Sequence, residues 1–197
     1  MRPLYSLLFG TVMALAAASQ ASPGTAPTLA SAAQSQIGIT LHYDPSYQRL
    51  AYPNGDVPLE RGVCTDVVIR AYRQLGIDLQ KLVHEDMRAN WNAYPHPAKW
   101  GLKRPDTNID HRRVPNLATF FRRHGMEIAP SRDPAQFRPG DLVVWALPDG
   151  GLPHIGIVAD RISAAGTPLM IHNIGSGAKM EDVLFAFKVT GHFRYPK

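Results

Sequence analysis

The sequence contains a single cysteine among its 197 residues. A lone cysteine cannot form a disulfide within the chain, so the fold must be stable without one. Cys64 is therefore a small buried side chain, a cross-link between molecules or a reactive thiol. The chain length suits one globular domain plus an export signal, and 45% of the residues are hydrophobic, which is enough to form a core.

Long apolar runs are also lacking. The stretch 4–18 is mostly apolar, but it is shorter than the ~20 residues of a membrane span. An arginine precedes it, and small residues with a plausible cleavage site at Ser19-Gln20-Ala21 follow, which is the order typical of a secretory signal. We therefore expect a signal peptide at 1–21, a leader or tether at 22–40 and an exported, periplasmic, soluble domain at 41–197.

Charge of one sign is not concentrated in any segment. The formal net charge is +5, and the basic residues are scattered without a nucleic-acid recognition motif. Such an excess fits anionic cell-wall surroundings, and it also fits an ordinary solvated surface. We expect no nucleic-acid partner and no stable membrane insertion, and the sequence does not indicate an oligomeric state.

The order of predicted elements indicates the fold class. Helical spacing and stop signals predict helices over 64–75, 79–87 and 117–124. Period-two alternation and turn residues predict strands over 141–147, 154–159, 169–173, 185–190 and 191–195, with a turn at Asp149-Gly150-Gly151 between the first two. Helices that precede an antiparallel sheet of about five strands predict an α+β fold. The segment at about 79–124 is interpreted as an insertion.

Cys64 falls in the first turn of a predicted helix, because Val68, Ala71 and Leu75 continue its face at helical spacing. A helix N-terminus presents unpaired N–H groups and a partial positive charge, both of which favour a thiolate. Asp66 in the same turn suits the helix dipole. This setting favours a nucleophile over an inert core residue.

Two histidines supply the groups that a thiol nucleophile needs. His154 begins a predicted strand, and the ordinary pKa of histidine suits a general base. His172 lies on the next predicted strand, where it can adjoin His154 and hold it in the required tautomer. Asn173 should point to the opposite face of that strand. The residues thus predict a Cys64–His154–His172 catalytic set.

This arrangement resembles the NlpC/P60 cell-wall peptidases, which are related to papain. The resemblance lies in four segments, over roughly residues 50–195: Gly62-Val63-Cys64-Thr65-Asp66, Pro139-Gly140-Asp141-Leu142, His154-Ile155-Gly156-Ile157 and Ile171-His172-Asn173. It implies a papain-like core and the same three catalytic residues. It also implies that Tyr52 helps to bind the amino end of the substrate. The chain departs from that family in Val63-Cys64-Thr65-Asp66 and in the insertion.

Polar residues of the insertion are further candidates. Arg112 or Arg113 would clamp a substrate carboxylate, although a surface loop with internal ion pairs explains the segment equally well. Histidines and carboxylates nearby match no zinc signature, so no metal or organic cofactor is expected. The candidate substrate-binding residues are Tyr52, Asp66, His111, Arg112, Arg113 and Asn173.

The sequence therefore predicts an exported cysteine peptidase or amidase that acts by acyl transfer. The resemblance implies a stem-peptide bond of peptidoglycan as its substrate. Two alternatives remain: a non-catalytic module that binds the cell wall or a protein, and a zinc-dependent cell-wall hydrolase that uses several of the eight histidines.

Overall fold

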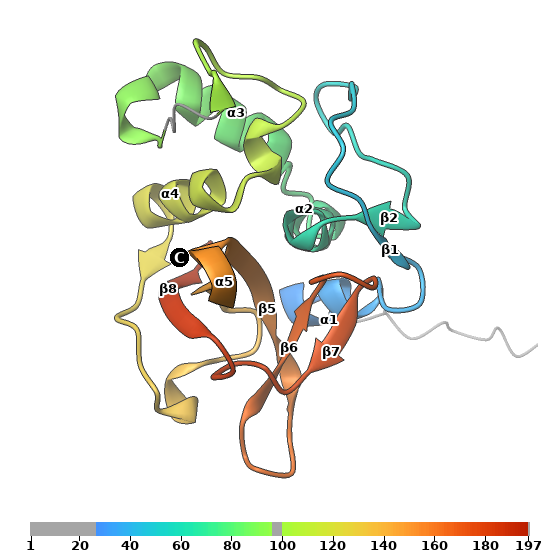
Figure 1. Cartoon of the computed structure of the whole chain (residues 1–197), viewed down its shortest axis with the longest axis vertical. Coiled ribbons are helices and arrows are strands. Elements are labelled where there is room, and N and C mark those ends of the chain that lie inside the picture. The colour runs from blue at the N-terminus through green and yellow to red at the C-terminus, as the bar shows by residue number, and fades with distance from the viewer. Residues whose placement is uncertain (1–26, 96–99, 197) are drawn as a thin grey trace, which may run out of the picture.

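Helices occupy the first part of the chain and strands the second in the computed structural model, which describes residues 27–95 and 100–196 (Figure 1). The predicted α+β class is confirmed. The helical elements are α1 (Leu29–Gln34), α2 (Cys64–Gln74), α3 (Leu79–Ala89), η1 (Trp91–Ala93), η3 (Asp110–Arg112), α4 (Val114–His124), η4 (Pro134–Gln136) and α5 (Pro148–Gly151). None of the described helices is long and apolar enough to cross a membrane.

The main sheet has six strands in the order β3-β8-β4-β5-β6-β7, and every neighbouring pair is antiparallel. Its strands are β3 (Met126–Glu127), β4 (Leu142–Ala146), β5 (Pro153–Ile162), β6 (Pro168–His172), β7 (Lys179–Glu181) and β8 (Lys188–Arg194). A small parallel pair, β1 (His42–Tyr43) and β2 (Arg61–Gly62), lies just before α2.

The last two predicted strands form one strand, β8. Val144 of β4 pairs with Gly191, whereas Trp145 pairs with Val189, so Thr190 is an extra residue in the ladder. Such a bulge breaks the period-two pattern that a sequence analysis follows. The apolar residues before β8 form a loop in which the ring of Phe185 packs against Phe137, 5.6 Å between centroids. β7 and the two-residue β3 were not predicted.

The sheet has an apolar cluster on each face. The larger one joins alternate residues of the sheet, including Ile155 and Ile157, to α1, α2 and α4. The smaller one contains Val143, Trp145 and Val158 on the other face. His154 belongs to this second face, where its ring stacks on Trp145 with 5.7 Å between centroids.

The N-terminal leader is shorter than expected, because α1 belongs to the domain. Thr28 caps α1, and Leu29 and Ala33 are buried in the larger cluster. Gln36 then donates its side-chain N–H to the carbonyl of Val67 in α2 at 2.8 Å. Residues 29–40 therefore pack as part of the fold rather than as a tether, whereas the expected signal peptide at 1–21 lies outside the described residues.

Two further boundaries differ from expectation. α4 begins at Val114 rather than at 117, because Pro115 occupies the first turn, where its missing N–H costs nothing. The Gly-rich segment expected as a turn forms the short helix α5 immediately before β5. Both changes occur near Cys64, because Val114 and Pro115 of α4 and Leu152 and Pro153 after α5 line one cavity with it.

Candidate active site

Cys64 is the first residue of α2, and a buried ion pair holds this helix start in place. Asp66 accepts a hydrogen bond from the Val63 N–H at 2.7 Å, which caps the helix. The same carboxylate pairs with Arg112 through two hydrogen bonds, Nε to Oδ1 at 2.9 Å and Nη2 to Oδ2 at 3.0 Å. Both partners are buried. Cys64 itself is only 4% exposed.

Two neighbours hold the loop that enters α2. Gly62 has φ +156°, and a Cβ at this position would lie 2.9 Å from Oδ2 of Asp66, so a side chain here would displace the cap. Asn173 donates from Nδ2 to the Gly62 carbonyl at 3.0 Å. The end of β6 is thereby tied to the start of α2.

The predicted histidine pair forms, and a carboxylate extends it. Nε2 of His154 lies 2.9 Å from Nδ1 of His172. Nε2 of His172 lies 3.1 Å from Oε2 of Glu181 on β7, although this contact falls short of good hydrogen-bond angles. His154 and His172 are buried, whereas the side chain of Glu181 is 39% exposed.

This line of three residues selects the tautomer of His154. A carboxylate accepts but does not donate, so Glu181 favours a proton on Nε2 of His172. Nδ1 of His172 is then an acceptor, and Nε2 of His154 must carry the proton between the two rings. Nδ1 of His154 is left with a free lone pair, which is the form that a general base requires.

The sulfur of Cys64 lies beside the histidine strand. Burial raises the pKa of the Cys64 thiol to about 12, opposed by hydrogen bonding to the backbone of Ile155, the residue after His154. Burial also lowers the pKa of His154 to about 3, and the charge of His172 adds to this effect. Both groups are therefore neutral at pH 7. The Cys64 side chain thus rests as a thiol rather than as a thiolate, and it would have to lose its proton during any attack.

Cys64 lines a cavity of about 250 Å³ between α2, α4 and the residues that follow α5. Tyr43, Trp100 and Arg113 line one part of it, and Leu152 and Pro153 line another. A second cavity, of about 490 Å³, shares Val114, Pro115 and Pro153 with the first. The two cavities therefore adjoin, and together they are called the groove here; Cys64 lines the smaller one.

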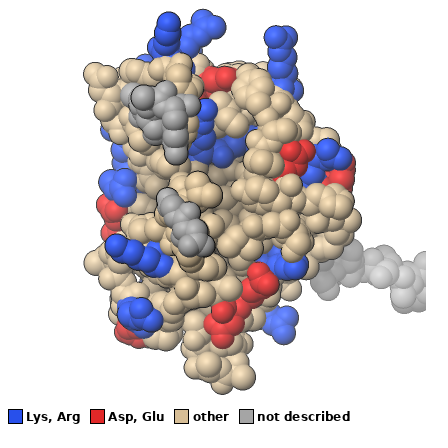
Figure 2. Space-filling model, in the orientation of Figure 1, with Lys and Arg blue, Asp and Glu red and all other residues tan. Residues whose placement is uncertain are grey.

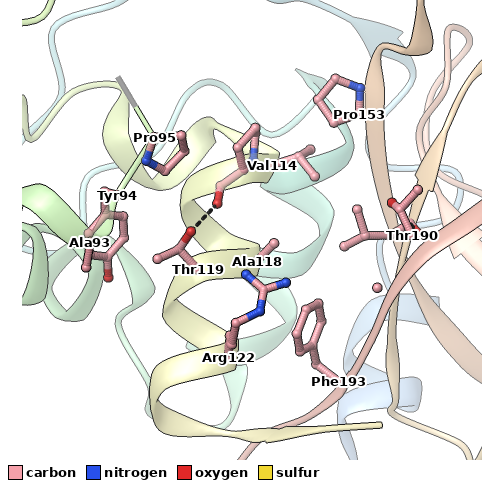
Figure 3. Close-up of a pocket in the computed structure, with 13 residues that line it drawn as sticks. Ala93, Tyr94, Pro95, Val114, Ala118, Thr119, Arg122, Pro153, Thr190 and Phe193 are labelled. Carbon is pink, nitrogen blue, oxygen red and sulfur yellow. Dashed lines mark hydrogen bonds between the residues drawn. The ribbon is translucent and has the colours of Figure 1, made fainter. Parts of the chain in front are cut away.

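Figure 3 shows how the second cavity is built. Val114, Ala118 and Arg122 project from α4 towards Thr190 and Phe193 of β8, and Pro153 closes one end. The guanidinium of Arg122 lies over the Phe193 ring, 5.5 Å from its centroid. This part of the groove is thus mainly apolar, with a basic residue at its far end.

The predicted substrate-binding residues divide into three groups. Arg113 lines the cavity beside Cys64. Asp66, Arg112 and Asn173 instead stabilise the helix start through the contacts given above. Tyr52 packs its ring edge-on against His84, which lines a different cavity, and His111 is buried with its pKa lowered by burial to about 3. Arg112 lines the cavity beside Cys64 as well, but its guanidinium is bonded to Asp66, so Arg113 is the better placed of the two arginines to meet a substrate.

The sequence analysis missed Glu181 and Tyr43. Glu181 follows Lys179-Met180, and its polar–apolar–polar alternation is a weak strand signal in a segment of three residues. Tyr43 lies on the two-residue strand β1, where no periodicity can be read, and its pKa is raised by burial and by Cys64 and Asp66. Among the described residues, no group of three or more His, Cys, Asp or Glu side chains is arranged to hold a metal ion.

Comparison with known proteins identifies the family of this chain and one similar protein. Residues 30–195 match the model of the domain of unknown function DUF1287, so the chain belongs to this family. The chain is also 53% identical to the uncharacterized protein YijF of Escherichia coli K12 over 199 aligned residues, which cover 95% of this chain and 96% of that protein. The family match begins within α1, in agreement with the packing of that helix in the core.

Proposed function

We propose that this protein is a cysteine hydrolase that cleaves an amide bond, with Cys64 as nucleophile, His154 as general base and His172 as the residue that orients it. The observation that carries the proposal is the line from Glu181 through His172 to His154, the residue before Ile155, whose backbone hydrogen-bonds the thiol of Cys64 at the start of α2. A base, an orienting group and a thiol within one site are the components of acyl transfer.

The chemistry follows from the neutral resting state. As Sγ of Cys64 attacks the carbonyl carbon, the thiol proton moves to Nδ1 of His154. The resulting oxyanion is stabilised by backbone N–H groups at the start of α2, where Cys64 and Thr65 have no preceding helical turn to pair with. His154 then protonates the leaving amine, and water releases the acyl group from the sulfur.

The substrate and the location are part of the same proposal. The sequence segments that resemble NlpC/P60 peptidases favour a stem-peptide bond of peptidoglycan, and the apparent signal at 1–21 favours a periplasmic site of action. The groove supports a peptide-like substrate, because its two adjoining cavities are mainly apolar and Cys64 lines one of them.

The test is digestion of purified peptidoglycan by the mature protein and by its Cys64→Ser and His154→Ala variants, with soluble fragments identified by mass spectrometry. We expect new amino groups from the wild type and a loss of at least ~10³-fold in each variant. Exposed Arg49→Gln is the matched control and should keep full activity. Wild-type rates in Cys64→Ser would refute the nucleophile.

A second candidate, a non-catalytic module that binds the cell wall, is favoured by one observation. The thiol is buried and its pKa is raised to about 12, which is the behaviour of an inert cysteine. This candidate predicts that wild type, Cys64→Ser and His154→Ala bind sacculi equally and that none releases fragments. The same digestion, followed by a sedimentation assay of binding, separates the two functions.

A further inference from the structure

Two adjacent arginines differ in whether their hydrogen bonds are satisfied. Arg112 uses its guanidinium on both oxygens of Asp66 and on the carbonyls of Ser46 and Asp44, at 3.1 and 3.2 Å for the carbonyls. Nη1 of Arg113, in contrast, is buried and has no hydrogen-bond partner within the described part of the chain. A buried donor of this kind is costly unless a ligand completes it.

The position of Arg113 is defined by an aromatic ring. Its guanidinium carbon lies 4.3 Å from the centre of the Trp100 ring, a distance typical of a cation–π contact. The stacked plane leaves the edge of the guanidinium, with its N–H groups, free to meet a planar partner. Both residues line the cavity that contains Cys64, and basic side chains are visible in the hollow near the centre of Figure 2.

The neighbouring carboxylates do not occupy this guanidinium. Asp106 accepts hydrogen bonds from Tyr47 at 3.0 Å and from Asn108 at 2.8 Å. Asp110 accepts from the backbone N–H of Asp106. Their charges act on Arg113 from a distance, and burial outweighs them, so that its pKa is lowered. Arginine nevertheless stays protonated at neutral pH.

The N-termini of two helices also favour a negatively charged group in this cavity. α2 begins at Cys64, and α4 begins at Val114, directly after Arg113, so two helix N-termini contribute to the cavity wall. Each N-terminus carries a partial positive charge that favours an anion. The opposite wall, Leu152 and Pro153, is apolar and brings no competing charge. The cavity is therefore suited to a group that is planar and negatively charged.

We infer that the cavity beside Cys64 is a carboxylate-binding subsite in which Arg113, stacked on Trp100, binds an acidic group of the substrate next to the scissile amide. That the bound carboxylate belongs to a substrate rests on the proposed hydrolase function. That the cavity binds a carboxylate does not depend on that function. It narrows the substrate class to peptides or amides with a free carboxylate close to the cleaved bond, and it assigns the apolar second cavity to the other side of that bond.

The deciding experiment measures binding without chemistry. A Cys64→Ala protein is titrated with glutarate, a dicarboxylate, and with glutaramide, its neutral analogue, at constant ionic strength. The indole N–H signal of Trp100 is followed by NMR and assigned with Trp100→Phe. We expect glutarate to bind at least about tenfold more tightly than glutaramide, and Arg113→Gln to abolish this preference. Arg49→Gln removes an equal, exposed charge elsewhere and should leave it intact.

A kinetic experiment connects the subsite to the thiol. Cys64 is alkylated with iodoacetate and with iodoacetamide, which differ in charge but little in size. We expect the rate with iodoacetate, divided by the rate with iodoacetamide, to fall about tenfold in Arg113→Gln and to stay unchanged in Arg49→Gln. Equal binding of glutarate and glutaramide in the titration would overturn the subsite. An Arg113-dependent preference together with a Cys64 inert to both reagents would support the subsite and refute the hydrolase.

Discussion

The two sides of the candidate site are stabilised in different ways. The cysteine wall, composed of Val63, Cys64, Asp66 and Arg112, is held by a buried ion pair whose donors and acceptors are matched. The histidine wall, composed of Trp145, His154, His172 and Glu181, is a chain of single contacts that ends on a carboxylate 39% exposed to solvent.

This difference separates stability from activity. Removing one member of a buried ion pair leaves an uncompensated charge, which is strongly destabilising. Changing an exposed carboxylate costs little free energy of unfolding, but here it alters the tautomer balance of the base. The cysteine wall should therefore respond to substitution by unfolding, and the histidine wall by a change in rate or pH profile.

The largest expected effect is on the rate of cleavage, at the residue proposed as the nucleophile. Cys64→Ser should lower the rate of amide cleavage by at least ~10³-fold, because a hydroxyl at this position is a far weaker nucleophile. Thermal unfolding should change little, since the side chain has nearly the same size. A variant that unfolds at wild-type temperature and cleaves at wild-type rate would break the assignment.

The next effect is on stability. Arg112→Met should lower the free energy of unfolding by about 3–5 kcal/mol, because it leaves the Asp66 carboxylate buried and unpaired. Asp66→Asn combined with Arg112→Met should regain part of that loss. The matched control is Arg113→Met, which removes a stacked guanidinium whose Nη1 has no hydrogen-bond partner among the described residues, and which should cost about 1 kcal/mol or less. Equal losses at the two arginines, in urea unfolding, would contradict the comparison.

Acid should destabilise the protein through two buried histidines, His154 in the histidine wall and His111 next to the cysteine wall. Burial lowers the pKa of His154 and of His111, which adjoins Arg112, from 6.5 to about 3. Between these values the unfolded chain binds more protons than the folded protein, so stability is complete above about pH 6.5 and falls as the pH drops towards 3. The slope should reach about 1.4 kcal/mol per pH unit for each histidine.

Substitution divides this acid dependence between the walls. His111→Gln and His154→Gln should each flatten the fall in unfolding free energy between pH 6.5 and 4, measured by urea titration at several pH values. The double variant should flatten it further. A slope unchanged by either substitution would mean that neither imidazole is held neutral by burial.

The smallest expected effect concerns the end of the histidine wall. Glu181→Gln should slow cleavage by about three- to tenfold, because an amide selects the His172 tautomer less strongly, while stability changes by less than about 1 kcal/mol. Glu181→Asp should restore part of the rate. The pH dependence of the cleavage rate should differ between Glu181→Gln and the wild type. Glu127→Gln is the control, since that carboxylate is similarly exposed and pairs with Arg122. An identical rate and pH profile in Glu181→Gln would exclude a positioning role.

Much of the site was predictable because its signals are local. A cysteine at the start of a periodic helix, and histidines at matching places on two strands, can be read within short windows of sequence. The register of β5 and β6 then brings His154 and His172 to 2.9 Å, as their spacing predicted. Fold class followed from the order of helices and strands.

The remaining parts were not predictable because they depend on partners far apart in the chain. The sequence does not distinguish Arg112 from Arg113, which are adjacent and equally basic. Their roles diverge because Asp66, 46 positions away, lies within reach of only the first. The bulge at Thr190 and the short strand of Glu181 likewise carry no periodic signal.

The sequence by itself determined the α+β order of elements and the candidate set Cys64, His154 and His172, because periodicity and residue type are properties of short segments. Only the tertiary structure decided that Arg113 faces the cavity, that Asp66 and Asn173 support the helix start, and that Glu181 completes the histidine line. These roles depend on which buried groups find a partner, and that is settled only when distant segments pack together and exclude water.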